Sequence, residues 1–181
     1  DHAVSVCLGI APLDGCANGQ DVLKNAYVAL RRAKALGIGQ SLTFSPDIGQ
    51  AARERTTLLR DLRQAFERRE LSIVYQPQID LTTGKIIGAE ALLRWNHPLR
   101  GVVLPGEFIG CAEETGLIVP IGEWVLREAC TQMQFWHTAY PPSQDMTISV
   151  NLSGKQFSHP ALISKALRDS ALVPSSLKLE I

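Results

Sequence analysis

The chain has 181 residues, of which 45% are hydrophobic and 20% charged, and its 18 Lys and Arg residues balance 18 Asp and Glu residues. The resulting net charge of +0 argues against broad electrostatic binding to DNA, RNA or an anionic membrane, so any anionic ligand must be held by a local group of side chains. No stretch approaches the ~20 apolar residues of a membrane-spanning helix, so a membrane connection is expected only through regions outside this sequence.

Four cysteines, Cys7, Cys16, Cys111 and Cys130, follow neither a CxxC spacing nor a dense disulfide framework. This pattern predicts reduced thiols and a cytoplasmic location. The sequence begins at Asp1 rather than Met and is inside an apolar run by residue 4, which predicts that it is a fragment of a longer protein.

The first elements expected along the chain are a strand over 4–11, a helix over 20–36 and a short strand over 42–44. The helix is indicated by apolar residues at three- and four-residue spacing, and Gly37 supplies its stop. A charged helix is expected over 50–69. Its arginines alternate with acids at helical spacing, which favours a solvated linker over a phosphate-binding surface.

From residue 71 the pattern changes to alternating strands and helices. Strands are expected over 71–79, 86–95, 146–152 and 177–181, and helices over 106–115, 119–138 and 155–170, the last interrupted at Pro160. Repeated βα units predict an α/β fold with a parallel sheet covered by helices, either doubly wound or closed as a (βα)₈ barrel. Because a closed barrel needs ~250 residues, this chain would form half of one.

Side chains alternate between the two faces of a strand, so sequence parity predicts which of them share a surface. Glu90 and Arg94 lie opposite the apolar set of their strand, and Gln76, Asn151 and Glu180 occupy the same face of other strands. In a barrel this face points inward, and functional groups gather at the carboxyl ends of the strands. Two carboxylates and an amide oxygen, without Cys or His, suit Mg²⁺, Mn²⁺ or Ca²⁺ rather than zinc. Arg94 and Gln76 could then bind a polar anionic substrate.

The same residues have a purely structural alternative. Glu90 could pair with Arg94, Glu180 with Lys178, and Asn151 could simply end its strand, and spacing alone does not decide between the two. Other conspicuous residues are assigned structural roles. His97 is interpreted as a surface or hydrogen-bonding residue without chemistry, Trp124, Met133 and Trp136 as helix core, and Glu107, Glu113 and Glu114 as structural acids.

Seven blocks of residues occur in an order that closely resembles the EAL-domain family. They are Tyr75-Gln76-Pro77, Glu90-Ala91-Leu92-Leu93-Arg94-Trp95, His97-Pro98, Pro105-Gly106-Glu107-Phe108-Ile109, Ala112-Glu113-Glu114-Thr115-Gly116-Leu117-Ile118, Val150-Asn151-Leu152-Ser153 and Leu179-Glu180-Ile181. That family comprises cyclic di-GMP phosphodiesterases on a modified TIM barrel. The resemblance runs from about Leu58 to the last residue, so the expected fold is the first half of a TIM-type (βα) barrel.

The resemblance also implies site residues and chemistry. It implies a two-metal Mg²⁺ or Mn²⁺ site with Glu90, which is also catalytic, Asn151 and Glu180 as ligands. It implies substrate contacts from Gln76, Leu92 and Arg94. A metal-activated water would attack a phosphodiester phosphorus of cyclic di-GMP and yield pGpG, and the intact protein is expected to be a homodimer. The family further needs an Asp-Asp pair and a later Lys, Glu and Gln. The sequence contains no Asp-Asp pair, so the fragment alone is expected to be inactive.

The segments 6–11 and 26–34 are similar to the end of a GGDEF domain, the diguanylate-cyclase family, although Tyr27 and Arg31 depart from its pattern. The expected organisation is therefore a C-terminal part of a GGDEF-like domain over 1–46, a linker helix over 47–69 and the N-terminal half of an EAL domain over 58–181. The leading hypothesis is cyclic di-GMP hydrolysis by a GGDEF-EAL protein. The alternatives are a catalytically inactive cyclic di-GMP receptor and a parent protein with diguanylate cyclase activity.

Overall fold

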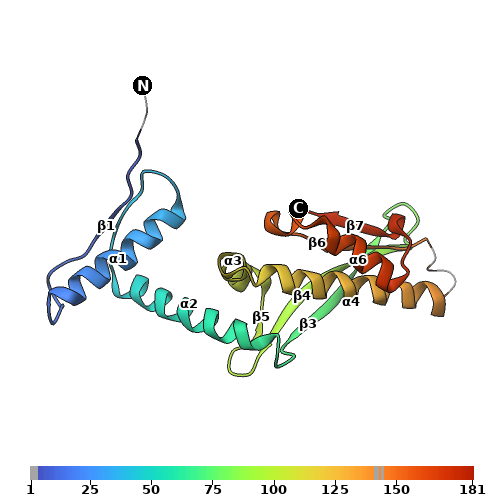
Figure 1. The fold of residues 1–181 in the computed structure, drawn as a ribbon, viewed down its shortest axis with the longest axis horizontal. Coiled ribbons are helices and arrows are strands. Elements are labelled where there is room, and N and C mark those ends of the chain that lie inside the picture. The colour runs from blue at the N-terminus through green and yellow to red at the C-terminus, as the bar shows by residue number, and fades with distance from the viewer. Residues whose placement is uncertain (1–3, 141–142, 144) are drawn as a thin grey trace. The chain divides into compact units, whose positions relative to one another are not determined.

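The chain divides into two compact units, Asp1–Leu58 and Leu59–Ile181. The structure is a computed structural model that describes residues 4–140, 143 and 145–181 (Figure 1). The boundary between the units falls inside one helix, α2 (Pro46–Ala65). None of the helices in the described residues is both long and apolar enough to cross a membrane.

The first unit contains two parallel strands, β1 (Leu8–Ile10) and β2 (Ser41–Thr43), joined through helix α1 (Gly19–Leu36). Asn18 caps α1, because its Oδ1 accepts a hydrogen bond from the Asp21 backbone N–H at 3.0 Å. The helix expected over 20–36 is confirmed. The strand expected over 4–11 is shorter than predicted, since pairing stops where the three residues of β2 end.

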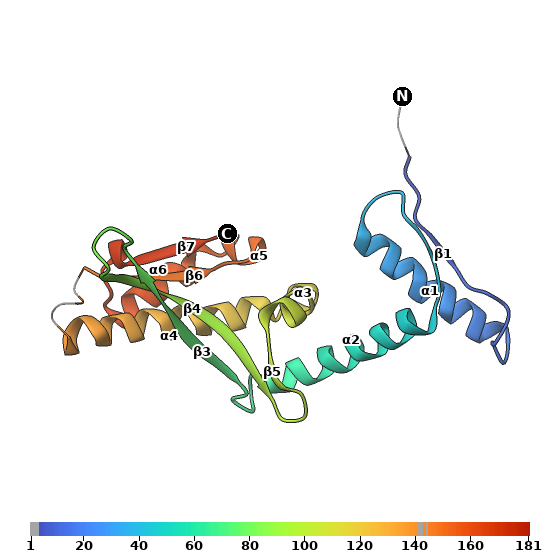
Figure 2. The same cartoon turned by 180° about the vertical axis from the view of Figure 1, so that it is seen from behind.

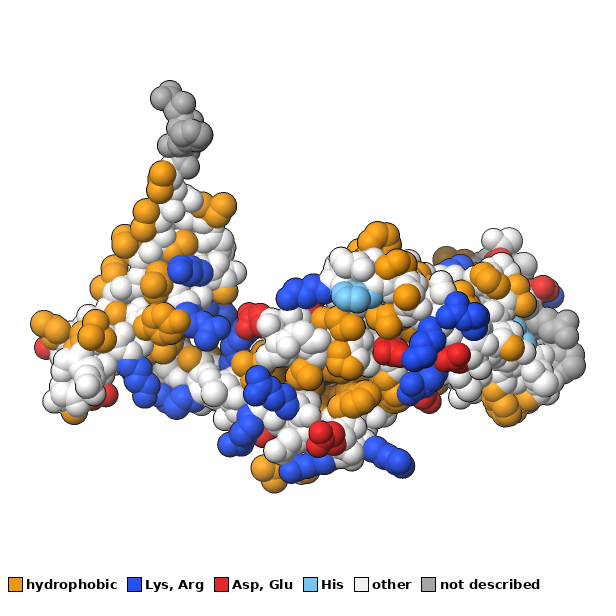
Figure 3. Space-filling model, viewed as in Figure 1, with side chains coloured by type: hydrophobic (Ala, Val, Ile, Leu, Met, Phe, Trp, Pro, Cys, Tyr) orange, Lys and Arg blue, Asp and Glu red, His pale blue; other side chains and the backbone are white. Residues whose placement is uncertain are grey.

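The core of the first unit is small. Gly9 lets β1 approach α1 closely, because a Cβ at Gly9 would overlap the Ala26 carbonyl oxygen. Ala29 and Ala33 are fully buried on α1, whereas Leu8 and Ile10 of β1 stay about half exposed. Figure 3 accordingly shows many hydrophobic side chains on the surface of this unit.

Helix α2 begins and ends four residues earlier than the expected range of 50–69. Ser45 precedes it and accepts the Ile48 N–H on Oγ at 3.5 Å, and Pro46 occupies the first helical position, where its missing N–H is harmless. Pro46 lies outside the helix range expected from the sequence. At the other end, Arg69 adopts φ 55° and the Glu70 N–H donates to the Ala65 carbonyl, so the chain turns away into the next strand.

The second unit holds the main sheet. Its strands are β3 (Leu71–Ile79), β4 (Ile86–His97), β5 (Gly101–Val103), β6 (Thr147–Asn151) and β7 (Leu177–Glu180). Its helices are α3 (Pro105–Thr115), α4 (Ile118–Ala139), α5 (Gly154–Phe157) and α6 (Pro160–Ser170), with a 3₁₀ turn η2 (Pro174–Ser176) before β7. The strand order is β3-β4-β6-β7, and β5 pairs with β4 outside this order.

The expected parallel sheet is correct for β4, β6 and β7 and wrong for the first strand pair. Strand β3 runs antiparallel to β4, as does β5. The reason is the short turn between β3 and β4, where Asp80 Oδ1 accepts the Thr82 and Thr83 N–H groups at 2.7 and 3.0 Å and Gly84 adopts φ 69°. A turn this short can join only antiparallel strands. The helix expected over 155–170 is two helices, because Pro160 starts α6.

Helices α3, α4 and α6 lie on one side of this sheet (Figures 1 and 2). The sheet side chains beneath them are buried, and we call this side the covered face. Its members include Ala89, Ala91, Leu93, Trp95, Ile148 and Val150. The Trp95 ring meets Phe108 of α3 edge-on, with ring centroids 5.6 Å apart. On α4, Met133 is fully buried as expected, whereas Trp124 and Trp136 are half-buried.

The outer side of the covering helices mixes apolar side chains with neighbouring opposite charges (Figure 3). One such pair joins Lys165 Nζ of α6 to Glu123 Oε1 of α4 at 2.7 Å. All four cysteines are free thiols. Burial in α4 raises the pKa of Cys130 to about 11, so this thiol stays protonated and unreactive at neutral pH.

Candidate active site

The other side of the sheet carries the polar residues singled out in the sequence. The register sets Gln76 opposite Glu90, Glu90 opposite Ser149, and Asn151 opposite Glu180. Residues paired across neighbouring strands point to the same side, as do residues two apart on one strand. We call this side the open face and define it by Gln76, Glu90, Leu92, Arg94, Asn151 and Glu180. All six are half-buried or exposed. In Figure 2, β3 and β4 lie in front and α4 lies behind them, so this helix covers the opposite side of the sheet.

Glu90 and Asn151 are in direct contact although 61 residues separate them. The Asn151 amide donates from Nδ2 to Glu90 Oε1 at 2.8 Å. The Leu152 N–H donates to the Glu180 carbonyl at 2.7 Å, which extends the pairing of β6 with β7 past Asn151. Three adjacent strands therefore contribute one residue each: Glu90 and Asn151 touch, and Glu180 follows as the next residue in register.

The chemistry of these three side chains fits a hard divalent cation. In the described part of the chain, no three His, Cys, Asp or Glu side chains group as a metal site, so a site here depends on the Asn151 amide. Asn151 uses its nitrogen to contact Glu90, and its oxygen can serve as a ligand atom. Two carboxylates and an amide oxygen match the ligand preference of Mg²⁺ and Mn²⁺.

The structural alternative, in which these acids pair with nearby bases, is not found. Among the residues that the structure describes, the ion pairs include neither Glu90 with Arg94 nor Glu180 with Lys178. The Arg94 guanidinium instead donates from Nη1 to the Leu93 carbonyl at 2.8 Å. Arg94 lies four residues along β4 from Glu90, so both residues belong to the open face.

A pocket of about 530 Å³ lies between the covered face, at Ala91 and Leu93, and helices α3 and α4, and it reaches the open face at Leu92 and Asn151. Its lining includes Leu92, Pro105, Ile109, Val125, Asn151 and Gln156. It is therefore bounded by β4 and β6 of the sheet, by α3 and α4, and by the segment that follows β6. A largely apolar pocket of this volume, with polar groups at one edge, is typical of a small-molecule site.

Gln156 supports the site and was missed in the sequence. It is 4% exposed, and its Oε1 accepts the Ser153 N–H at 2.9 Å. Its amide lies against α4 so closely that a Cβ at Gly122 would overlap Nε2. Gln156 therefore braces the segment after Asn151 against the core helix. The available signal was the Ser-x-x-Gln spacing of a capping box.

At the end of the open face away from the pocket, the strands β3, β4 and β6 pack closely together. Gln78 Nε2 donates to Ser149 Oγ at 3.4 Å, and Ser149 is 1% exposed. A Cβ at Gly88 would lie 2.6 Å from the Thr147 carbonyl oxygen and 3.1 Å from Gln78 Oε1. Glycine at this position lets β3, β4 and β6 close together, which fixes the strands that carry Glu90 and Asn151.

The family model and the similar proteins of known sequence indicate the same protein family. The family model of the EAL domain matches residues 59–181. The chain is 45% identical over 183 residues to the bifunctional diguanylate cyclase/cyclic di-GMP phosphodiesterase MucR of Pseudomonas aeruginosa, covering 98% of this chain and 26% of that protein. It is 33% identical over 180 residues to the cyclic di-GMP phosphodiesterase NbdA of the same organism, covering 98% and 23%. The chain thus spans about a quarter of the length of these relatives.

Solved structures agree with this similarity. The complex of the P. aeruginosa MucR phosphodiesterase with cyclic di-GMP superimposes with a TM-score of 0.66 at 51% sequence identity, covering 69% of this chain and 51% of that one. The P. aeruginosa FimX EAL domain bound to cyclic di-GMP gives a TM-score of 0.56 at 28% identity, covering 67% and 48%.

Proposed function

The chain belongs to the EAL domain family, and from this premise we propose that it forms part of a metal-dependent cyclic di-GMP phosphodiesterase whose site is the open face. One observation carries the proposal: Glu90 and Asn151 are in contact at 2.8 Å, and Glu180 is next in register. The similarity to MucR, NbdA and the cyclic di-GMP complexes supports the choice of substrate.

We further propose that the sheet is the first half of a TIM-type barrel with the open face inside. The parallel strands β4, β6 and β7, with α3, α4 and α6 on one side of the sheet, support this arrangement. The polar, partly exposed residues of the open face would then line the barrel at the carboxyl ends of its strands, where the active sites of such barrels lie.

Glu90, Asn151 and Glu180 would hold Mg²⁺ or Mn²⁺ through their oxygens. Such ions lower the pKa of a bound water and neutralise charge on a phosphate. Hydrolysis of one phosphodiester adds the hydroxyl of water to phosphorus, breaks the bond to the ribose 3′ oxygen and leaves a proton on that oxygen. The product is linear pGpG.

The remaining residues of the open face suit substrate binding. The Arg94 guanidinium can donate two hydrogen bonds to phosphate oxygens, and Gln76 lies opposite Glu90 with an amide that can donate or accept. Leu92 lies between the two functional residues of β4 and also lines the apolar pocket. A guanine base presents two flat apolar faces, so we place one base of cyclic di-GMP against Leu92 in this pocket.

For the first unit, we propose that residues 1–46 are the C-terminal part of a GGDEF-like domain and that α2 leads from it into the EAL domain. The support is the parallel β1–α1–β2 arrangement and the extent of the match to MucR, which covers 98% of this chain. We also propose that the intact protein acts as a homodimer, as the sequence resemblance implies.

The test uses the intact natural protein that contains this chain. Purified protein is incubated with cyclic di-GMP and Mg²⁺ or Mn²⁺, and pGpG is measured by chromatography. Glu90→Gln and Asn151→Ala should each lower kcat at least about 100-fold while circular dichroism stays unchanged. The exposed Glu67 provides the matched control, since Glu67→Gln should retain full turnover.

Unchanged turnover in Glu90→Gln would refute the assignment of the site. If the wild-type protein binds cyclic di-GMP but forms no pGpG, the protein would be assigned as a cyclic di-GMP receptor and not as an enzyme.

A further inference from the structure

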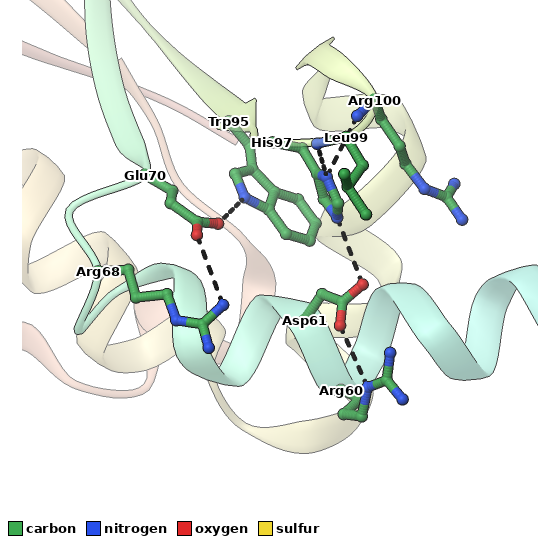
Figure 4. Close-up of polar contacts among 8 residues, drawn as sticks. All are labelled: Arg60, Asp61, Arg68, Glu70, Trp95, His97, Leu99 and Arg100. Atoms are coloured by element: carbon green, nitrogen blue, oxygen red, sulfur yellow. Dashed lines mark hydrogen bonds and ion pairs between the residues drawn. The ribbon is translucent and has the colours of Figure 1, made fainter.

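A buried histidine connects α2 to the end of β4. His97 is 6% exposed, and both of its ring nitrogens have partners (Figure 4). Nδ1 accepts the backbone N–H groups of Leu99 at 3.1 Å and Arg100 at 3.3 Å, and Nε2 lies 3.3 Å from Asp61 Oδ2. Because Nδ1 accepts two hydrogen bonds, it carries no proton. The ring proton therefore sits on Nε2 and is donated to Asp61.

The chemical identity of Asp61 matters for this arrangement. Its other oxygen, Oδ1, lies 3.2 Å from Arg60 Nε. An ionised carboxylate can only accept hydrogen bonds, so it holds His97 in the form with the proton on Nε2. An asparagine of nearly the same shape could instead donate from Nδ2 to the ring. That would allow the proton to move to Nδ1, and the Leu99 and Arg100 N–H groups would lose their acceptor.

These bonds shape the connection from β4 to α3. His97 pairs with Gly101 at the start of β5, so the turn closed by Nδ1 returns the chain alongside β4. Helix α3 begins two residues after β5, and its residues Pro105, Gly106 and Ile109 line the pocket that reaches the open face at Leu92 and Asn151. The turn at His97 thus precedes the helix that forms one wall of that pocket.

Aromatic packing makes a second connection between the same parts. Trp95 lies between His97 and Phe108 of α3, with ring centroids 5.0 and 5.6 Å away. Its indole Nε1 donates to Glu70 Oε2 at 3.0 Å, just after α2 (Figure 4). A displacement of His97 would therefore reach α3 both through the backbone turn and through the Trp95 ring.

We infer that Asp61 and His97 are positioning residues for cyclic di-GMP binding: Asp61 fixes the protonated nitrogen of His97, and His97 fixes the turn that places the α3 wall of the pocket. The inference rests on the proposed function in assigning this pocket to the dinucleotide. Neither residue lines the pocket, and neither belongs to the open face. Their loss should thus weaken substrate binding and leave the catalytic step at Glu90 and Asn151 nearly unchanged.

The first test is Asp61→Asn in the intact protein. The Kd for cyclic di-GMP is measured in a metal-chelated buffer, which suspends the proposed hydrolysis, and kcat is measured with Mg²⁺. We expect Kd and KM to rise about tenfold, kcat to stay within about twofold, and Tm to stay within about 2 °C. Asp80→Asn is the matched control, because the Asp80 carboxylate likewise accepts hydrogen bonds, from two N–H groups of the turn between β3 and β4, and its change should leave Kd unaltered.

A spectroscopic measurement reports on the mechanism directly. The ¹⁵N shifts of the His97 ring, assigned by difference from His97→Gln, should show a protonated Nε2 in the wild-type protein and a mixture of the two neutral forms in Asp61→Asn. A wild-type ring protonated at Nδ1 alone would overturn the inference.

Two substitutions of His97 separate positioning from general stability. The amide oxygen of His97→Asn can take the place of Nδ1 in accepting the turn N–H groups, so Kd should stay within about threefold. His97→Ala leaves those groups unpaired and should weaken binding about tenfold or more. Equal Kd values in wild type and Asp61→Asn would overturn the inference. It would also be overturned if the variants lost binding and kcat in proportion to their loss of folded protein. If the wild-type protein binds cyclic di-GMP without hydrolysing it, the proposed phosphodiesterase activity is refuted. The Kd comparison between wild type and the variants still tests the inference in that case.

Discussion

The covered face and the open face of the sheet share the same strands but make different contributions to the protein. Along β4, the buried Ala91 and Leu93 alternate with the half-buried Glu90, Leu92 and Arg94. The buried set packs under α3 and α4, whereas Glu90, Leu92 and Arg94 lie on the opposite face and are less buried. Stability and the proposed chemistry are thus separated by one residue of strand parity, and substitutions on the two faces should have separable effects.

The largest expected effect tests the covered face. Phe108 is fully buried and contacts Trp95, so Phe108→Ala should lower the free energy of unfolding by about 3–5 kcal/mol. The matched control is Phe135 of α4, which is 57% exposed, and Phe135→Ala should cost less than about 1 kcal/mol. Urea unfolding followed by tryptophan fluorescence measures both. Similar losses at the two positions would mean that burial under the helices does not set stability.

A second prediction concerns the place where the covered side supports the site. Gly122→Ala should destabilise the fold by about 1–3 kcal/mol, because the new Cβ would overlap the Gln156 amide and push the segment after Asn151. Gly110→Ala on α3 is the control. No atom lies within 4 Å of its new Cβ, so it should stabilise the protein by about 0.4–1 kcal/mol. Thermal unfolding should show a lower Tm for Gly122→Ala and a higher Tm for Gly110→Ala. A higher Tm for Gly122→Ala would disprove the close packing of Gln156 against α4.

A third prediction compares the stability lost when the same substitution, valine to alanine, is made on each side of the sheet. Val150 is 1% exposed on the covered face, and Val74 is 44% exposed on the side of the sheet that carries the open face. Val150→Ala should cost about 2 kcal/mol of unfolding free energy, from two lost methyl groups and the cavity they leave, and Val74→Ala about 0.5 kcal/mol. Chemical denaturation measures the difference. Equal values would show that the side carrying the open face is packed as tightly as the covered face.

These comparisons also show what could be predicted from the sequence. The faces follow from strand periodicity, which places Glu90, Asn151 and Glu180 on one side without any knowledge of the fold. Contacts between distant segments could not be predicted in this way. The hydrogen bond between His97 and Asp61 joins residues 36 apart, and a lone histidine before a proline gives no sign of burial. Strand β5 was missed because three residues are too few to show alternation.

The smallest expected effect is a pH dependence at Asp61, away from both faces. Partial burial acts to raise the pKa of this carboxyl, but the hydrogen bonds from Arg60 and His97 and the charge of Arg60 outweigh it and lower the pKa below its usual value of 3.8. Since the unfolded chain lacks these partners, the ionised carboxylate stabilises the folded state above about pH 4. That contribution disappears as pH falls through the folded-state pKa. Unfolding free energies measured between about pH 5 and about pH 3 should therefore fall more in wild type than in Asp61→Asn. Parallel pH profiles would show that Asp61 is not preferentially ionised in the folded protein, and the contact with His97 would then lack its electrostatic basis.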